Sequence, residues 1–203
     1  MGILTISELA SYILTTCADK QITHMKLQQL AYYVKAWTLV AGYPIILNAE
    51  FEKWQFGPVN QTLYNEYKAY GNRVITEKVS PPLMAPNDQK IIDFILENYC
   101  DYRAFDLSAM THNEKPWQQT GNNRVISDNA IKKHYSNEPF ANNFADFDPE
   151  NGPFYMLRDP AWYAFTMDMS PHDKELATFV DSYREYKRLK RQSKAFISFL
   201  QTT

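Results

Sequence analysis

Apolar residues recur at helical spacing along most of this chain, and most clearly between Thr23 and Gly42. There they lie three and four positions apart, which indicates a buried helix, and glycine is the residue that ends a helix at least cost. The stripe consists of Leu27, Leu30, Val34, Trp37 and Ala41. An apolar stripe of this kind must be covered by other elements. We therefore expect this segment to form the central helix of the core, with Trp37 inside it.

The same spacing predicts further helices on both sides of this segment. They cover about residues 6–17, 60–70, 87–99, 104–111 and 127–135. Asn60 is a suitable N-cap and Gly71 a suitable stop for the helix at 60–70. The longest predicted helix runs from 171 to 200. Ser170 is a suitable N-cap for it, and Pro171 occupies the first helical position, where proline is favoured.

Two segments lack helical spacing. Residues 44–56 mix large apolar side chains with isolated polar ones, and residues 73–79 alternate weakly, so we expect them to pair as a small hairpin-like sheet. Gly57-Pro58 predicts a tight turn that leads into the helix at Asn60. The predicted fold class is mainly α: a compact helical domain with a small β element, plus a C-terminal extension that ends in a long helix.

The chain length favours one domain with an extension. Of the 203 residues, we assign 1–140 to the helical domain and 141–203 to the extension. The extension begins with a segment rich in proline and aromatic residues, 141–170, followed by the long helix at 171–200.

Charge is distributed unevenly along the chain. The net charge of −2 argues against a general nucleic-acid binder, which needs clustered positive charge. Residues 184–194, however, hold six basic residues and one acidic one. This basic segment is either a solvated helix face, a surface that docks an acidic protein, or a contact for nucleic acid.

The sequence contains none of the common catalytic motifs. The glycines are isolated, so neither a phosphate-binding loop nor a dinucleotide turn is present, and the four histidines show no zinc-binding spacing. No serine lies in a nucleophile elbow. We therefore expect no enzyme activity, no catalytic residues, no metal site and no cofactor.

The cysteines and the hydropathy point to the cytoplasm. Cys17 and Cys100 are too far apart in the sequence to suggest a redox or zinc motif, and we expect both to be reduced. No apolar run reaches the ~18 residues of a membrane span, so we expect no contact with a membrane.

Five segments of the chain resemble, in order, the Panacea domain of bacterial and phage-associated antitoxins. They are KLQQLAYYVKAW (26–37), FEKWQFGPV (51–59), YNEYKAYG (64–71), LSAMTHNEKPW (107–117) and ISDNAIKKHY (126–135). Together they span about residues 5–136. Two positions depart from the family pattern, since Ala31 replaces a usual leucine and Thr38 a common histidine.

The resemblance implies an antitoxin that neutralises a cognate toxin by direct protein–protein binding. Two alternatives stay open: an adaptor that delivers the toxin to an AAA+ protease, or a DNA-binding autoregulator that uses the basic C-terminal helix. The family implies no catalytic residues. The toxin, the stoichiometry and the oligomeric state are not determined by the sequence.

Candidate partner-binding residues fall into three groups. One group adjoins the apolar stripe of the central helix, the second lies in the THNEKPW block, and the third is the basic segment. These residues are Lys26, Gln29 and Tyr33, then His112 and Trp117, and finally Arg184, Lys187, Arg188 and Arg191.

Overall fold

The computed structural model describes residues 4–43, 49–157, 179–180, 182–184, 186–188 and 191. The chain divides into two compact units, Met1–Ser136 and Asn137–Thr203, each of which is described by itself. In the described part of the chain, no helix is both long enough and apolar enough to cross a membrane.

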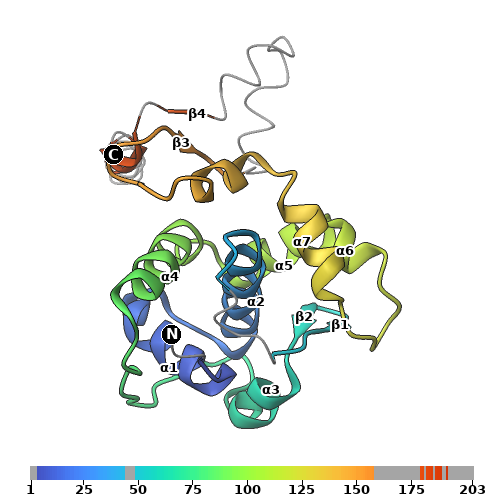
Figure 1. Ribbon diagram of the computed structural model, residues 1–203. Helices are drawn as coiled ribbons and strands as arrows, with labels where there is room; N and C mark the ends of the chain where they lie inside the picture. The colour runs from blue at the N-terminus through green and yellow to red at the C-terminus, as the bar shows by residue number, and fades with distance from the viewer. Residues whose placement is uncertain are drawn as a thin grey trace, which may run out of the picture. The chain divides into compact units, whose positions relative to one another are not determined.

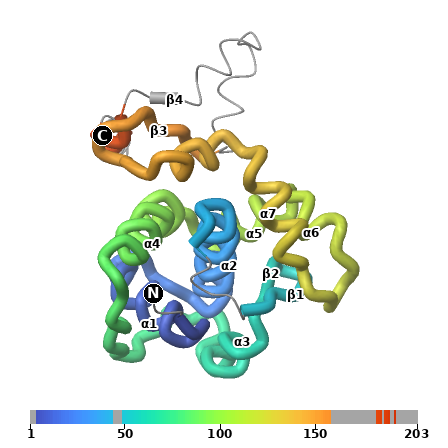
Figure 2. The backbone as a smooth tube through the Cα atoms, in the orientation of Figure 1, coloured from blue at the N-terminus to red at the C-terminus, as the bar shows by residue number. Residues whose placement is uncertain are grey.

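Helix α2 (His24–Val40) is the centre of the first unit. Thr23 caps its start, because its side chain accepts a hydrogen bond from the amide of Lys26, and Gly42 follows its end with a φ of +74°. Four helices pack around it, as Figures 1 and 2 show. They are α1 (Ile6–Thr16), α4 (Pro86–Tyr99), α5 (Ala104–His112) and α7 (Asp128–Tyr135). Trp37 is 1% exposed and donates to the hydroxyl of Tyr99, so its predicted core position is confirmed.

Polar side chains of α2 are buried together with its apolar ones. Gln28 donates to the carbonyl of Asn60 and accepts from its amide, while Lys35 donates to the carbonyl of Ala49 and pairs with Asp128. The helix is therefore enclosed on several faces, and loops around it provide partners for Gln28 and Lys35, whereas the buried hydroxyl of Tyr32 has no hydrogen-bond partner among the described residues.

The remaining helices of this unit are short. Asn60 caps α3 (Gln61–Tyr67) as predicted, and the 3₁₀ turns η1 (Ala18–Lys20) and η2 (Lys68–Tyr70) follow α1 and α3. Helix α6 (Lys115–Gln118) was not predicted, because four residues are too few to show a periodic pattern. The mainly α fold with a small β element is confirmed.

The small sheet forms from a different pair of segments than predicted. Strands β1 (Glu52–Trp54) and β2 (Gly57–Val59) make an antiparallel hairpin, whereas Val74 forms an isolated bridge with Thr23. The predicted pairing with 73–79 is therefore wrong for residues 49–56, whereas residues 44–48 lie outside the described part of the chain. A two-residue turn closes the hairpin locally, at a much smaller loop-closure cost than pairing across α3.

The second unit has a small aromatic core. It contains η3 (Pro139–Phe144), and strands β3 (Phe154–Tyr155) and β4 (Phe179–Val180) pair antiparallel. The Asn143 side chain fixes β3, because it donates to the carbonyl of Tyr155 and accepts from its amide. The ring of Phe154 lies 4.7 Å from those of Tyr183 and Tyr186.

The predicted long helix at 171–200 is only partly testable. Residues 171–178 and 192–200 lie outside the described residues, while 183–184, 186–188 and 191 are helical. Phe179 and Val180 were predicted to be helical but form a strand. Aromatic and β-branched residues favour strands, and pairing with β3 satisfies their backbone groups.

Cys17 and Cys100 form a disulfide, which corrects the expectation of two reduced cysteines. They follow the ends of α1 and α4, and their Cα atoms lie 6.3 Å apart despite 83 residues of separation in sequence. Both helices pack against α2, so tertiary packing brings together two residues that form no sequence motif.

Reducing this disulfide is expected to lower the free energy of unfolding by about 2–5 kcal/mol, because the bond restricts the unfolded chain. Urea titrations with and without dithiothreitol measure the effect. The double variant Cys17→Ser/Cys100→Ser, which has no bond to lose, should not respond to the reductant. A wild-type midpoint that dithiothreitol leaves unchanged would contradict a stabilising role.

Candidate functional site

The turn of the hairpin is an exposed segment of the first unit that side chains from other elements hold in place. Trp54 pairs with Gly57, so Gln55 and Phe56 form a two-residue turn. Gly57 has a φ of +120°, and a Cβ atom at this position would lie 2.3 Å from Nε2 of Gln29. Two features therefore require glycine at position 57: the backbone conformation and the close approach of Gln29.

Side chains from helices α2 and α5 hold the two carbonyl groups of this turn. Gln29 of α2 and Ser108 of α5 donate to the carbonyl of Phe56, at 3.2 and 2.9 Å. Nε2 of His112 lies 3.0 Å from the carbonyl of Gln55 and donates to it in the tautomer that protonates this nitrogen.

Trp117 completes the support of the turn. Its indole nitrogen lies 3.3 Å from the carbonyl of Trp54, and its ring packs 4.1 Å from that of His112. Lys53 covers the same indole ring, with its ammonium 4.1 Å from the ring centre. The backbone of the turn is thus fixed, while the side chain of Phe56 remains 56% exposed.

Two buried tyrosines of the first unit, Tyr33 and Tyr135, are joined through one carboxylate. The carboxylate of Glu114 accepts hydrogen bonds from the hydroxyls of Tyr33 and Tyr135, which joins α2 and α7 to the start of α6. Burial raises the pKa of both tyrosines well above the ordinary value, and the negative charge of Glu114 adds to the effect. Both hydroxyls therefore stay protonated and act as donors.

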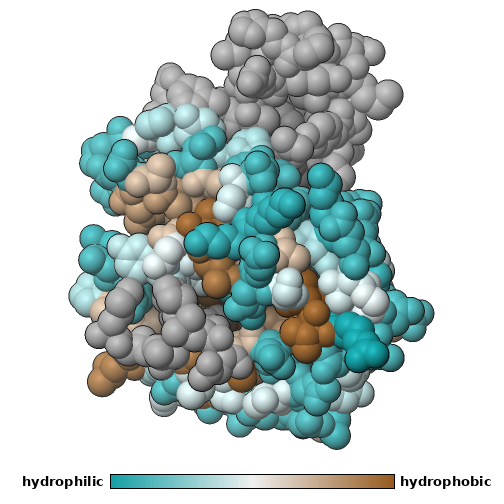
Figure 3. All heavy atoms as spheres, turned by 45° about the vertical axis from the view of Figure 1, so that its right-hand side comes forward, coloured by the Kyte–Doolittle hydropathy of each residue, from teal (hydrophilic) through white to brown (hydrophobic). Residues whose placement is uncertain are grey.

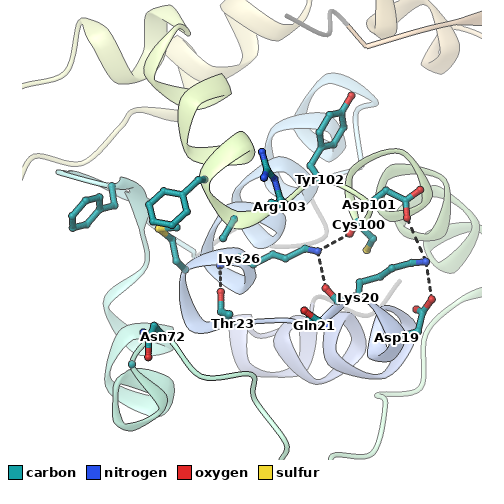
Figure 4. Close-up of a pocket in the computed structure, with 15 residues that line it drawn as sticks. Asp19, Lys20, Gln21, Thr23, Lys26, Asn72, Cys100, Asp101, Tyr102 and Arg103 are labelled. Atoms are coloured by element: carbon teal, nitrogen blue, oxygen red, sulfur yellow. Dashed lines mark hydrogen bonds and ion pairs between the residues drawn. The ribbon is translucent and has the colours of Figure 1, made fainter. Parts of the chain in front are cut away.

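A groove of 680 Å³ lies beside the turn, and both Phe56 and Phe105 line it. Figure 4 shows Lys26 reaching across it toward the backbone of Lys20 and Cys100. Lys20 itself lies between Asp19 and Asp101, at 2.7 and 3.3 Å. The side chain of Phe105 is 72% exposed.

The structure brings together the five predicted partner-binding residues of the first unit, but not on one exposed face. Lys26, Gln29 and Tyr33 are buried, and His112 and Trp117 are half-buried. Each of the five binds a group in or near the turn, the groove or the tyrosine pair. Their contacts fix the position of these neighbouring segments. Contact of any of the five with a partner stays a prediction.

The predicted basic residues lie in the second unit. Arg184, Arg188 and Arg191 are exposed, whereas the ammonium of Lys187 lies 4.5 Å from the centre of the Tyr183 ring. Their role in binding a partner also stays a prediction.

Sequence reasoning missed the exposed Phe56 and Phe105. Phe56 stands directly before Gly57-Pro58, where a turn was predicted, so its exposure could have been inferred. Phe105 has only the small Ala109 as an apolar partner at helical spacing within its short helix, which is a weaker signal. In the described ranges, no group of three or more His, Cys, Asp or Glu residues is arranged to hold a metal ion.

Comparison with known proteins confirms the resemblance drawn from the sequence. Residues 27–118 match the family described as antitoxin SocA-like, Panacea domain. The chain is 32% identical over 118 residues to the protein named Antitoxin SocA of Caulobacter vibrioides (strain NA1000 / CB15N), an alignment that covers 51% of this chain and 62% of that relative. The chain therefore spans less than two thirds of the relative's length. No solved structure matches the chain.

Replacing Gly57 with alanine is expected to lower the free energy of unfolding by about 2–4 kcal/mol, through a disfavoured φ and displacement of the Gln29 side chain. Gly42→Ala is the matched control, since its φ is also positive but nothing lies within 4 Å of the added Cβ. It should lose only about 1–2 kcal/mol. Equal losses in urea titrations would contradict the tight contact at Gly57.

Proposed function

With residues 27–118 forming a Panacea domain of the SocA-like antitoxins, we propose that the chain neutralises a cognate toxin by binding it directly. The proposed mode is stoichiometric masking of the toxin's active surface. The second unit adds contacts specific to the partner.

The observation that carries this proposal is the fixed turn that presents Phe56. The carbonyls of both turn residues, and that of Trp54 directly before them, are each held by a side chain from elsewhere in the fold. An exposed aromatic side chain on a rigid backbone loses little further freedom when a partner covers it, and aromatic residues are frequent anchors of protein interfaces. This makes Phe56 the strongest candidate contact of the domain.

One face of the molecule also has a composition that suits a protein partner. On the face drawn in Figure 3, apolar residues form several small patches separated by polar ones. An apolar centre with a polar rim is the usual composition of interfaces between proteins that also exist separately.

Phe56→Ser is expected to weaken toxin binding at least tenfold and to reduce rescue of growth when the toxin encoded beside this gene is co-expressed. The free energy of unfolding should change by no more than about 0.5 kcal/mol, because the side chain is mostly exposed. Leu83→Ser is the matched control, since Leu83 is fully exposed but does not line the groove. Calorimetric titration with the toxin and a growth assay provide the measurements.

The same growth assay in strains that lack AAA+ proteases separates masking from delivery to a protease. Masking predicts that the toxin persists in a complex and that protection survives in strains lacking AAA+ proteases. Protection that disappears in such a strain, together with a shortened toxin half-life, would support the adaptor alternative. Toxicity that persists although both proteins are soluble would refute an antitoxin role.

A second contact is proposed for the basic segment of the second unit. Three of its arginines are exposed, and exposed charges contribute little to folding. Their summed field, however, raises encounter rates with an acidic partner and is screened by salt over about 8–10 Å.

Replacing Arg184, Arg188 and Arg191 with glutamate is therefore expected to slow toxin association about tenfold and to remove most of its salt dependence. Lys187 is left in place because it packs on Tyr183. Stopped-flow association at two salt concentrations measures the effect. Unchanged rates combined with loss of salt-dependent binding to the gene's own promoter would favour the autoregulator alternative.

A further inference from the structure

We propose that the groove beside the turn receives a segment of the toxin in which an acidic side chain adjoins an apolar one. The acidic group would pair with Lys26, and the apolar group would lie between Phe56 and Phe105. This inference rests on the proposed function and assigns the contact to a defined site in the first unit.

The charge of the groove provides the first argument. Of the three cations that line it, Lys20 pairs with Asp19 and Asp101, and Arg103 pairs with Asp106 at 2.8 Å. Lys26 is held instead by two backbone carbonyls, those of Lys20 and Cys100, at 2.8 and 2.7 Å.

An ammonium group has three donors, so this arrangement leaves one donor of Lys26 for a further acceptor. The residue is only 5% exposed, and burial lowers the pKa of its ammonium, while the charges of Asp101 and Asp19 act in the opposite direction without contacting it directly. A carboxylate arriving in the groove would supply a third acceptor and a counter-charge in direct contact with the ammonium.

The start of α5 strengthens the same preference. Arg103, Ala104 and Phe105 line the groove at the N-terminal end of this nine-residue helix. The first amides of a helix lack acceptors within it, and the helix dipole is positive at this end. The Asp106 side chain accepts a hydrogen bond from the amide of Arg103, and the next amides of this first turn have no acceptor within the helix.

Two exposed phenylalanines provide the apolar part of the site. Phe56 comes from the hairpin and Phe105 from α5, and both line the groove although they are far apart in sequence. Exposed aromatic side chains that converge on one groove are a typical anchor for an apolar side chain of a partner. The volume of 680 Å³ suits a few side chains of a segment, within the ~300–1,000 Å³ of most ligand-binding clefts.

Photo-crosslinking in the full-length complex tests the location. Benzoylphenylalanine in place of Phe105 should crosslink to one toxin segment that contains an aspartate or glutamate next to an apolar residue. The same probe in place of Leu83 should not label that segment. Formation of the complex without a crosslink from position 105, or a crosslink to a second copy of the antitoxin, would overturn the proposal.

A double-mutant cycle tests the pairing with Lys26. Lys26→Met should weaken toxin binding at least tenfold, and the exposed Lys90→Met should change it less than twofold. Changing the crosslinked acidic residue of the toxin to its amide should weaken binding to the wild-type antitoxin at least tenfold, but to Lys26→Met less than threefold. Equal losses against both antitoxins would overturn the pairing.

The toxin variant keeps the test decisive if Lys26→Met is unstable, because it leaves the antitoxin unchanged. Full affinity of the amide variant for the wild-type antitoxin would then overturn the proposal. A wild-type chain that fails to bind the toxin at all refutes the proposed function itself, which is a different result from a complex that forms without using the groove.

Discussion

A polar group removed from water must find a partner within the protein, and helix α2 places several such groups in the core. Gln28, Gln29 and Lys35 are each at most 3% exposed, and each binds the backbone of a loop outside α2. Leaving one of these groups unpaired would cost about 1–3 kcal/mol or more. The central helix therefore determines where the surrounding loops lie, in addition to providing the apolar core.

The candidate site is a direct consequence of this constraint. Gln29 reaches the hairpin turn only because Gly57 has no side chain, and Ser108, His112 and Trp117 hold the turn and the residue before it as well. Three of the five blocks that carry the family resemblance, 26–37, 51–59 and 107–117, thus contribute to one structural task. They fix a short turn so that Phe56 faces outward on a rigid support.

Lys26 connects the same helix to the groove and to the disulfide. Its ammonium binds the carbonyl of Cys100, whose side chain is bonded to Cys17 at the end of α1. The ends of α1 and α4 and the start of α2 are thereby held together around one buried charge. A cation that is fixed in this way costs little reorganisation when a carboxylate binds to it.

The sequence by itself determined the helices of the first unit other than the short α6, the capping role of Asn60, the buried position of Trp37 and the Panacea resemblance. These follow from local periodicity, capping chemistry and motif order, which need no knowledge of distant contacts. Tertiary structure decided the hairpin partner of β1, the strand at Phe179–Val180 and the pairing of Cys17 with Cys100. It also decided that Lys26, Gln29 and Tyr33 point inward, because a polar residue beside an apolar stripe can be buried wherever a distant backbone group satisfies it.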